Sequence, residues 1–265
     1  MTPRLIVSDL DGTLLGSDHT LHESTVEVLR ALVKQGHHVA LASGRHYHDM
    51  KVFRDQLDIP AHLISTNGAY VHDPEGTLLA ATHVDPEHAK TLINLPRPPQ
   101  VRLNLYRESG WHIDAEAPHL LSLHASTGFG YEVVPPDQMD INGVGKVLYL
   151  GDPEALKQLE EQAHKAHGAA LHITYSTIDS LEIMAGGVNK GVALASLLER
   201  LALTPAECMA FGDNLNDTEM LVLAGEAQVM ANAHLDLFDR LEGAERIGHH
   251  GEAAVAEWLK KRFEL

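Results

Sequence analysis

Val7-Ser8-Asp9-Leu10-Asp11-Gly12-Thr13-Leu14-Leu15 is the stretch that decides the fold. It continues a short apolar run from Arg4 to Ser8, which predicts a buried strand that ends near Gly12. Open α/β sheets bind ligands at this end of a strand. If extended backbone continues to Asp11, both carboxylates point to one side and need a cation between them. Carboxylate oxygens in such a place suit Mg²⁺, which leaves room for a phosphate.

The composition is that of an acidic globular protein. The 265 residues are enough for one or two domains with a sizeable core. Lys and Arg number 20 against 37 Asp and Glu, which gives a formal net charge of −17. This charge argues against nucleic acid as a partner, because a phosphate backbone would be repelled. A small phosphorylated substrate would need a local positive site made by metal, Lys and Arg.

Cysteine usage and hydropathy indicate a cytoplasmic protein. Cys208 is the single cysteine, so no internal disulfide can form, which fits a reducing compartment. The first predicted strand lies within nine residues of the N-terminus, which leaves no space for a cleaved signal. No apolar run approaches membrane-spanning length, so we expect no membrane partner. The sequence gives no indication of an oligomeric state.

Strands and helices alternate in the first and last thirds of the chain, and this alternation predicts a Rossmann-like, doubly wound parallel sheet. The expected strands are 4–8, 38–42, 61–65, 208–211, 228–230 and 246–248, with a hairpin that joins 70–72 to 78–80. The expected helices are 23–35, 46–57, 192–201, 218–223, 234–241 and 252–263.

The pattern changes between about His83 and Ala185. Short strands with hairpin-like spacing replace the strand and helix alternation, which predicts an α+β sheet with helices on one face. The expected strands are 101–106, 111–113, 131–134, 147–150, 171–175 and 181–184, with helices that start near 85 and span 118–126 and 154–167. We therefore predict a core made of residues 1–82 and 186–265 with an inserted α/β cap made of residues 83–185.

Polar groups follow the ends of several core strands. They are Asp9 and Asp11, Ser43, Asn67, and Asp213 with Asp217. Together with Lys190 they supply the nucleophile, the proton donor, the metal site and the cation that phosphoryl transfer requires.

Each of these residues has an expected role. Asp9 would attack phosphorus to form an aspartyl phosphate, and Asp11 would act as general acid and then as general base. Mg²⁺ would be held by Asp9, by the backbone carbonyl of Asp11 and by Asp213, with Asp217 in a supporting position behind them. Ser43 and Lys190 would hold the transferring oxygens.

Each of these residues also has a plainer interpretation. Ser43 could cap the helix that follows it, although helix N-termini also bind phosphate. Lys190 could be a surface charge, and Asn67-Gly68 could be an ordinary turn. Asp213 and Asp217 could be turn acids with nothing bound. The 19 histidines lack Cys or Glu companions at ligand spacing, which argues against zinc.

The motifs resemble those of a known superfamily. Asp9-x-Asp11-Gly12-Thr13, Ser43, Lys190 and Gly212-Asp213-x-x-x-Asp217 are similar, in order, to the four motifs of the haloacid dehalogenase-like hydrolases. The resemblance implies a Rossmann-like core and Mg²⁺-dependent phosphate transfer, and an acid at Asp11 favours a phosphatase or mutase. The insertion between Ser43 and Lys190 resembles the cap of the Cof-like subfamily, whose local signatures match Thr66-Asn67-Gly68-Ala69, Leu181-Glu182-Ile183 and Asn189-Lys190-Gly191.

Further stretches, among them Ser43-Gly44-Arg45-His46 and Gly110-Trp111, are similar to those of thiamin-pathway phosphatases in this subfamily. That similarity implies hydroxymethylpyrimidine pyrophosphate, pyridoxal phosphate or other small phosphates as substrates. The residues expected to contact substrate are Ser43, Gly44, Arg45, Asn67, Asn216, Glu182 and Trp111, of which Trp111 could equally be core packing.

The expected function is that of a Mg²⁺-dependent phosphatase for small phosphorylated metabolites. The cap would close over the core, exclude water and select the leaving group. Two alternatives remain open. A sugar phosphomutase of the same fold would pass the phosphoryl group to a second hydroxyl. A non-catalytic protein would bind a phosphorylated metabolite without turnover.

Overall fold

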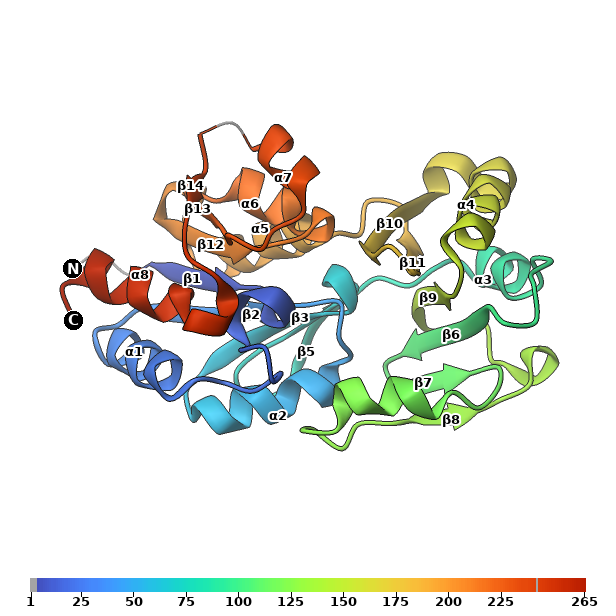
Figure 1. The fold of residues 1–265 in the computed structure, drawn as a ribbon, viewed down its shortest axis with the longest axis horizontal. Helices are drawn as coiled ribbons and strands as arrows, with labels where there is room; N and C mark the ends of the chain where they lie inside the picture. Colours follow the sequence, from blue (N-terminus) through green and yellow to red (C-terminus); the bar gives the residue numbers. More distant parts are fainter. Residues whose placement is uncertain (1–3, 242) are drawn as a thin grey trace.

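β1 (Leu5–Ser8) lies near the middle of an eight-stranded sheet in the computed structural model of the chain, which describes residues 4–241 and 243–265 (Figure 1). Residues 1–3 of the predicted core therefore lie outside the described residues. The strand order is β14-β13-β12-β1-β2-β3-β4-β5. The other strands are β2 (His38–Ala42), β3 (Ala61–Ser65), β4 (Tyr70–His72), β5 (Leu78–Ala81), β12 (Cys208–Gly212), β13 (Glu226–Val229) and β14 (Glu245–Arg246). All neighbours from β14 to β3 pair in parallel, whereas β4 and β5 form an antiparallel edge.

Helices cover both faces of this sheet. Ile6 of β1 packs in the apolar cluster that includes residues of α1 (Glu23–Lys34), α2 (Tyr47–Leu57) and α8 (Ala254–Phe263). Leu5 and Val7 pack on the opposite face with α5 (Lys190–Arg200), α6 (Thr218–Leu223) and α7 (Leu235–Arg240). Side chains alternate along a strand, so an apolar run is buried on both faces. The predicted doubly wound parallel sheet is thus confirmed.

A second sheet is inserted between β5 and α5 and lies beside the first (Figure 1). Its order is β10-β11-β9-β6-β7-β8, and all its pairings are antiparallel except β7 with β8. The strands are β6 (Arg102–Arg107), β7 (Gly110–Ile113), β8 (Tyr131–Val133), β9 (Val144–Leu150), β10 (Leu171–Thr177) and β11 (Ser180–Ala185). We call this sheet with its helices the cap.

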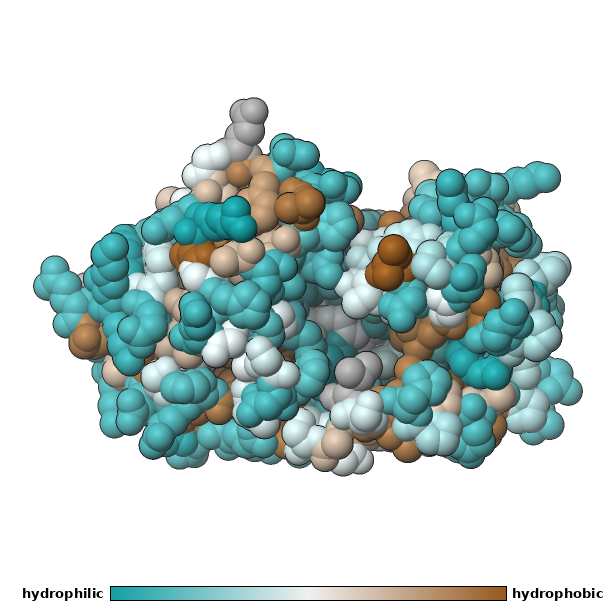
Figure 2. Space-filling model, viewed as in Figure 1, coloured by the Kyte–Doolittle hydropathy of each residue, from teal (hydrophilic) through white to brown (hydrophobic). Residues whose placement is uncertain are grey.

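The two faces of the cap sheet differ. Leu103, Val147 and Tyr149 belong to the apolar cluster formed with α3 (Pro86–Ile93) and α4 (Pro153–His167). Tyr106, Trp111 and Leu148 form a smaller cluster on the opposite face, which lines the cavity described below. The face of the molecule drawn in Figure 2 is mostly hydrophilic and is hollowed between the core and the cap. Among the described residues, no helix combines the length and apolar character needed to cross a membrane.

A few predicted elements differ in detail. Residues 118–126 were expected to be an α-helix, but Pro118–His124 is a 3-10 helix, because the chain turns again at 124–128 and leaves only short-range bonds such as Leu120 N–H to Ala117 O. The predicted strand 147–150 begins earlier, at Val144. The last predicted helix begins at Ala254, after a 3-10 turn at His250–Glu252. Other short turns span Thr66–Gly68, Pro136–Gln138, Gly168–Ala170, Pro205–Glu207 and Leu215–Asp217.

Candidate active site

The carboxyl ends of four neighbouring strands bring the candidate residues together. β12, β1, β2 and β3 are adjacent and parallel, and they end at Gly212, Ser8, Ala42 and Ser65. The segments that follow carry Asp213, Asp9, Ser43 and Asn67. Parallel strands have their carboxyl ends at one edge of the sheet, so side chains far apart in sequence gather there.

Lys190 joins two of the acids. Its Nζ lies 2.6 Å from Asp9 Oδ1 and 2.6 Å from Asp217 Oδ1, and the side chain is fully buried. Burial disfavours the charged amine, but the carboxylates of Asp217 and Asp9 outweigh it and raise the pKa of Lys190 above its ordinary value. Lys190 is therefore a buried, protonated cation and not a surface charge.

Asp9 has one committed oxygen and one open oxygen. Oδ1 accepts from Lys190, whereas Oδ2 accepts no hydrogen bond from any residue that the structure describes. Its backbone N–H donates to Phe211 O at 3.0 Å, which ties the residue to the end of β12. Burial raises the pKa of Asp9 and Lys190 lowers it, with a net increase. An added positive charge would favour the ionised, nucleophilic form.

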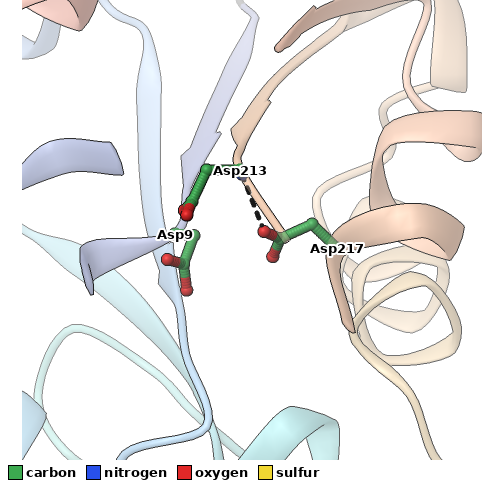
Figure 3. A group of neighbouring side chains, drawn as sticks. All are labelled: Asp9, Asp213 and Asp217. Atoms are coloured by element: carbon green, nitrogen blue, oxygen red, sulfur yellow. Dashed lines mark hydrogen bonds between the residues drawn. The ribbon is translucent and has the colours of Figure 1, made fainter. Parts of the chain in front are cut away.

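Asp213 and Asp217 face Asp9 from the loop after β12 (Figure 3). Asp217 Oδ2 accepts from the backbone N–H groups of Asp213 and Asn214, both at 3.0 Å, and so shapes this loop. Thr13 Oγ1 donates to Asp213 Oδ1 at 2.7 Å. Burial, with the nearby Asp217 carboxylate, raises the pKa of Asp213 to about 7. The three carboxylates of Asp9, Asp213 and Asp217 would hold their negative charges more readily beside a cation.

The acidic cluster fits a divalent cation. One carboxylate oxygen from each of Asp9, Asp213 and Asp217 lies within 4.8 Å of the others. All the donors are hard oxygens, which Mg²⁺ prefers over nitrogen or sulfur. Gly12 has φ +77°, and a Cβ on it would overlap the Asp213 carboxylate, so a glycine is needed for the close approach. Both oxygens of Asp217 already accept hydrogen bonds, Oδ1 from Lys190 and Oδ2 from two backbone N–H groups, whereas one oxygen of Asp9 is open. The carboxylates of Asp9 and Asp213 are therefore the better placed ligands.

Asp11 points its carboxylate to Arg45 and His19. Arg45 Nε lies 2.6 Å from Asp11 Oδ2 and Nη2 lies 2.7 Å from Oδ1, while His19 Nδ1 lies 3.3 Å from Oδ1. Burial opposes ionisation, but these hydrogen bonds outweigh it and hold the pKa of Asp11 well below its ordinary value. The extended backbone considered from the sequence does not reach Asp11, because β1 ends at Ser8 and a wide turn spans Leu10–Leu14.

Ser43 is buried in a loop that is tied to the next strand end. Its N–H donates to Ile64 O at 2.9 Å, its carbonyl accepts from Asn67 N at 3.0 Å, and its Oγ accepts from Arg45 N at 3.2 Å. The cap of α2 is His46, whose Nδ1 accepts from His48 N at 3.1 Å. The plainer interpretation of Ser43 as a helix cap is therefore wrong, because the helix begins only at Tyr47.

A cavity of about 450 Å³ lies between the two sheets. Asp9, Asp11, Ser43, Gly44, Arg45 and Asn216 line its core side, and Tyr106, Trp111, Lys146, Leu148 and Glu182 line its cap side. Trp111 is 3% exposed, and its indole N–H donates to Asn104 Oδ1 at 2.9 Å. It is thus packed within the cap while it also borders the cavity. Asn67 lies just behind this wall, bonded to Glu182 and Asn216.

Two buried charges at this interface were missed from the sequence. Lys146 stands alone in the apolar strand Val144–Leu150, and a single charge inside such a strand is a signal that could have found it. Asp49 is fully buried on α2 and accepts from Arg45, from His124 Nδ1 at 2.8 Å and from Thr127 Oγ1. His124 and Thr127 belong to the cap, so their pairing with Asp49 has no local sequence signal.

The parallel sheet carries an acidic cluster at its strand ends, and a second sheet covers this cluster across a cavity. These features define a capped, Rossmann-like α/β enzyme. The chain belongs to the haloacid dehalogenase-like hydrolase family, whose sequence profile matches residues 6–259. It is 38% identical over 256 residues to the HMP-PP phosphatase of Cronobacter sakazakii, with 97% of this chain and 94% of that protein covered.

Solved structures show the same fold. A haloacid dehalogenase-like hydrolase from B. subtilis superposes with a TM-score of 0.87 at 24% identity, over 97% of this chain and 99% of the other. The crystal structure of TM0651 from Thermotoga maritima gives a TM-score of 0.82 at 27% identity, over 98% and 97% of the two chains. The predicted family, the core and the inserted cap are therefore confirmed.

Proposed function

We propose that the protein is a Mg²⁺-dependent phosphatase that hydrolyses small phosphorylated metabolites through a phosphorylated Asp9. The observation that carries the proposal is the position of Asp9 in the cavity wall, with one oxygen held by Lys190, the other open, and the Asp213 carboxylate within 4.8 Å. A nucleophilic carboxylate needs this arrangement, in which one oxygen is fixed and the second can reach phosphorus.

Asp9 and Asp11 would divide the reaction into two displacements. Asp9 Oδ2 attacks phosphorus, the bond from phosphorus to the leaving oxygen breaks, and Asp11 gives that oxygen a proton. Water then attacks the aspartyl phosphate while Asp11 takes its proton, which releases inorganic phosphate and the free Asp9 carboxylate. The contacts of Asp11 with Arg45 favour its ionised form, which is the form that accepts the proton of water in the second displacement. Before the first displacement Asp11 must therefore take up a proton and release Arg45.

Positive groups would balance the charge of the phosphate. Mg²⁺, held by Asp9, Asp213 and the backbone carbonyl of Asp11, would neutralise charge between the carboxylates and the phosphate oxygens. The Ser43 hydroxyl would donate a hydrogen bond to an oxygen of the transferring phosphoryl group, and Lys190 would keep Asp9 oriented. Asp217 fixes Lys190 from behind, at 2.6 Å, and shapes the loop of Asp213.

The cap would select the leaving group. The cavity is large enough for a small organic alcohol, and Tyr106 and Trp111 offer aromatic walls against which a planar ring can pack. We propose residues 83–185 as the cap domain. Given the similarity to the HMP-PP phosphatase, we propose hydroxymethylpyrimidine pyrophosphate and pyridoxal phosphate as substrates. The buried, unpaired thiol of Cys208 supports a cytoplasmic location.

A panel of phosphate esters assayed for phosphate release, with and without Mg²⁺, tests the proposal. Asp9→Asn should lower kcat by at least about 10⁴-fold, because it removes the nucleophile. Asp239→Asn is the matched control, since Asp239 is exposed on α7. Acid quenching followed by mass spectrometry should locate a phosphoryl group on Asp9.

Other outcomes would favour the alternatives. Full activity in Asp9→Asn would contradict the nucleophile assignment. An isomerised product without free phosphate would indicate a phosphomutase. Tight binding of phosphorylated metabolites without turnover would indicate a non-catalytic binding protein.

A further inference from the structure

Lys146 is a buried charge at the interface between cap and core. It lies in β9, the strand between β11 and β6 in the cap sheet, and is 2% exposed. Its Nζ donates to Glu182 Oε1 at 2.7 Å and to Gly44 O at 2.8 Å. Glu182 is a cap residue, whereas Gly44 follows the end of β2 in the core. A buried ammonium group needs such partners to offset its lost hydration.

Glu182 extends this contact to a second core loop. Its Oε2 accepts a hydrogen bond from Asn67 Nδ2, and Asn67 Oδ1 accepts from Asn216 Nδ2 at 3.1 Å. A Cβ on Gly44 would lie 3.1 Å from Asn67 Oδ1 and 3.5 Å from both carboxylate oxygens of Glu182. The cap ion pair is therefore packed closely between the segments that follow β2 and β3.

These two core segments are also bonded to each other. Asn67 N donates to Ser43 O, and Thr66 N donates to Arg45 O at 2.9 Å. Thr66 and Asn67 have φ values of +53° and +56°, which residues with a side chain adopt rarely and keep only when their surroundings hold them. The bond from Asn67 to Glu182 of the cap is one of the contacts that hold this conformation.

Lys146 acts through its neighbours in this arrangement. Two of its ammonium donors are committed to Glu182 and Gly44, and Nζ lies 4.6 Å from the centre of the Tyr106 ring. Lys146 contacts Gly44 directly and Asn67 through Glu182. Both contacts reach the loop that carries Ser43. Seating the cap therefore adds hydrogen bonds to the part of the core where the phosphate is expected to bind.

We propose that Lys146 is a positioning residue of the phosphatase reaction: with Glu182 it aligns the Ser43–Gly44 loop and Asn67 when the cap is seated. This inference rests on the proposed function. It assigns to the cap a role in the phosphoryl-transfer step in addition to its choice of leaving group.

A double substitution separates this role from stability. Lys146→Met alone leaves the Glu182 carboxylate buried with Asn67 as its remaining partner, which should destabilise the fold. Lys146→Met with Glu182→Met removes both charges together, so neither is left buried without its partner, although Gly44 O and Asn67 Nδ2 each lose one hydrogen bond. Lys157→Met is the control, because Lys157 is an exposed lysine on α4 of the same cap.

We expect the double variant to unfold below the wild-type temperature but above that of Lys146→Met, and to lose about 100-fold in kcat at a temperature where it is folded, as a misplaced phosphate contact would cause. The loss should be equal for a bulky aromatic phosphate and for acetyl phosphate, whose leaving group is too small to depend on the cap wall. Lys146→Gln keeps a donor without the charge and should lose about tenfold; it provides the kinetic test if the double variant does not fold.

Three outcomes decide the matter. Wild-type kcat on acetyl phosphate in a folded double variant, or in Lys146→Gln, would overturn the positioning role. A loss confined to the bulky ester would also overturn it, because Lys146 and Glu182 would then act on the leaving group. If the wild-type protein releases phosphate from no ester, the proposed function itself fails, which is a distinct result.

Discussion

Arg45 binds both carboxylate oxygens of Asp11, with Nε 2.6 Å from Oδ2 and Nη2 2.7 Å from Oδ1. Such a two-point contact fixes the plane of the carboxylate as well as its charge. The same guanidinium reaches Asp49 through Nη1 at 2.7 Å. Asp11, the proposed general acid and base, is thus connected through Arg45 to the part of α2 that the cap contacts.

Asp11→Asn should lower kcat by about 10²- to 10⁴-fold, the usual contribution of a general acid and base. The amide can still accept a hydrogen bond from Arg45, so the fold should persist. Steady-state phosphate release, with circular dichroism as the check on folding, measures both effects. Asp18→Asn is the control, because Asp18 is an exposed carboxyl in the same loop. Wild-type turnover in Asp11→Asn would remove Asp11 from this role.

Mg²⁺ should stabilise the folded protein, because the acidic cluster exists only in the folded state. At a concentration 100 times its Kd, a bound ion adds about 2.7 kcal/mol to the free energy of unfolding. Thermal denaturation in EDTA and in Mg²⁺, at matched ionic strength, measures the gain. Asp213→Asn should abolish it, whereas the exposed Asp239→Asn should keep it. An equal gain in Asp213→Asn would place the ion elsewhere.

Asp49→Asn should weaken the seating of the cap. Asp49 is fully buried and accepts from Arg45 as well as from His124 and Thr127 of the cap. Removal of one partner from a buried charge pair destabilises by about 3–5 kcal/mol. Urea denaturation measures this change in the free energy of unfolding. Asp58→Asn, directly after the same helix, is the control, because Asp58 is exposed and its partner Arg30 is not buried. Equal stability of the two variants would argue against a structural role for Asp49.

The free energy of unfolding should fall in mild acid because of the buried His46. Burial lowers the pKa of His46 from 6.5 to about 4, so the unfolded chain binds the proton first as the pH falls. The contribution of His46 to the free energy of unfolding is full above pH 6.5 and is lost progressively toward pH 4. Between about pH 7 and about pH 5 the loss amounts to about 2 kcal/mol.

Urea denaturation at several pH values tests this dependence. His46→Gln retains a donor for Arg107 O, which His46 Nε2 contacts at 2.6 Å, and should flatten the curve. The control His119→Gln alters an exposed histidine and should keep the wild-type slope. A slope unchanged in His46→Gln would show that other groups cause the acid sensitivity.

Local sequence patterns determined most of the fold and the centre of the site. Apolar runs between turn residues located the strands, and helical periodicity located most helices. Because the carboxyl ends of parallel strands meet, the polar residues after those strands could be grouped without coordinates. Asp9, Asp213 and Asn67 were found in this way, whereas Lys190 was identified from its place in the order of motifs.

The tertiary structure decided which side chains pair across the interface. Lys146 and Gly44 are 102 positions apart, and His124 and Asp49 are 75 apart. No periodicity relates such residues, because their contact depends on how the cap sheet lies against the core. The orientation of Asp11 toward Arg45 likewise follows from the turn after β1 and the packing of α2. Local patterns specify elements and their ends, but the partner of a buried charge is set by which surfaces meet.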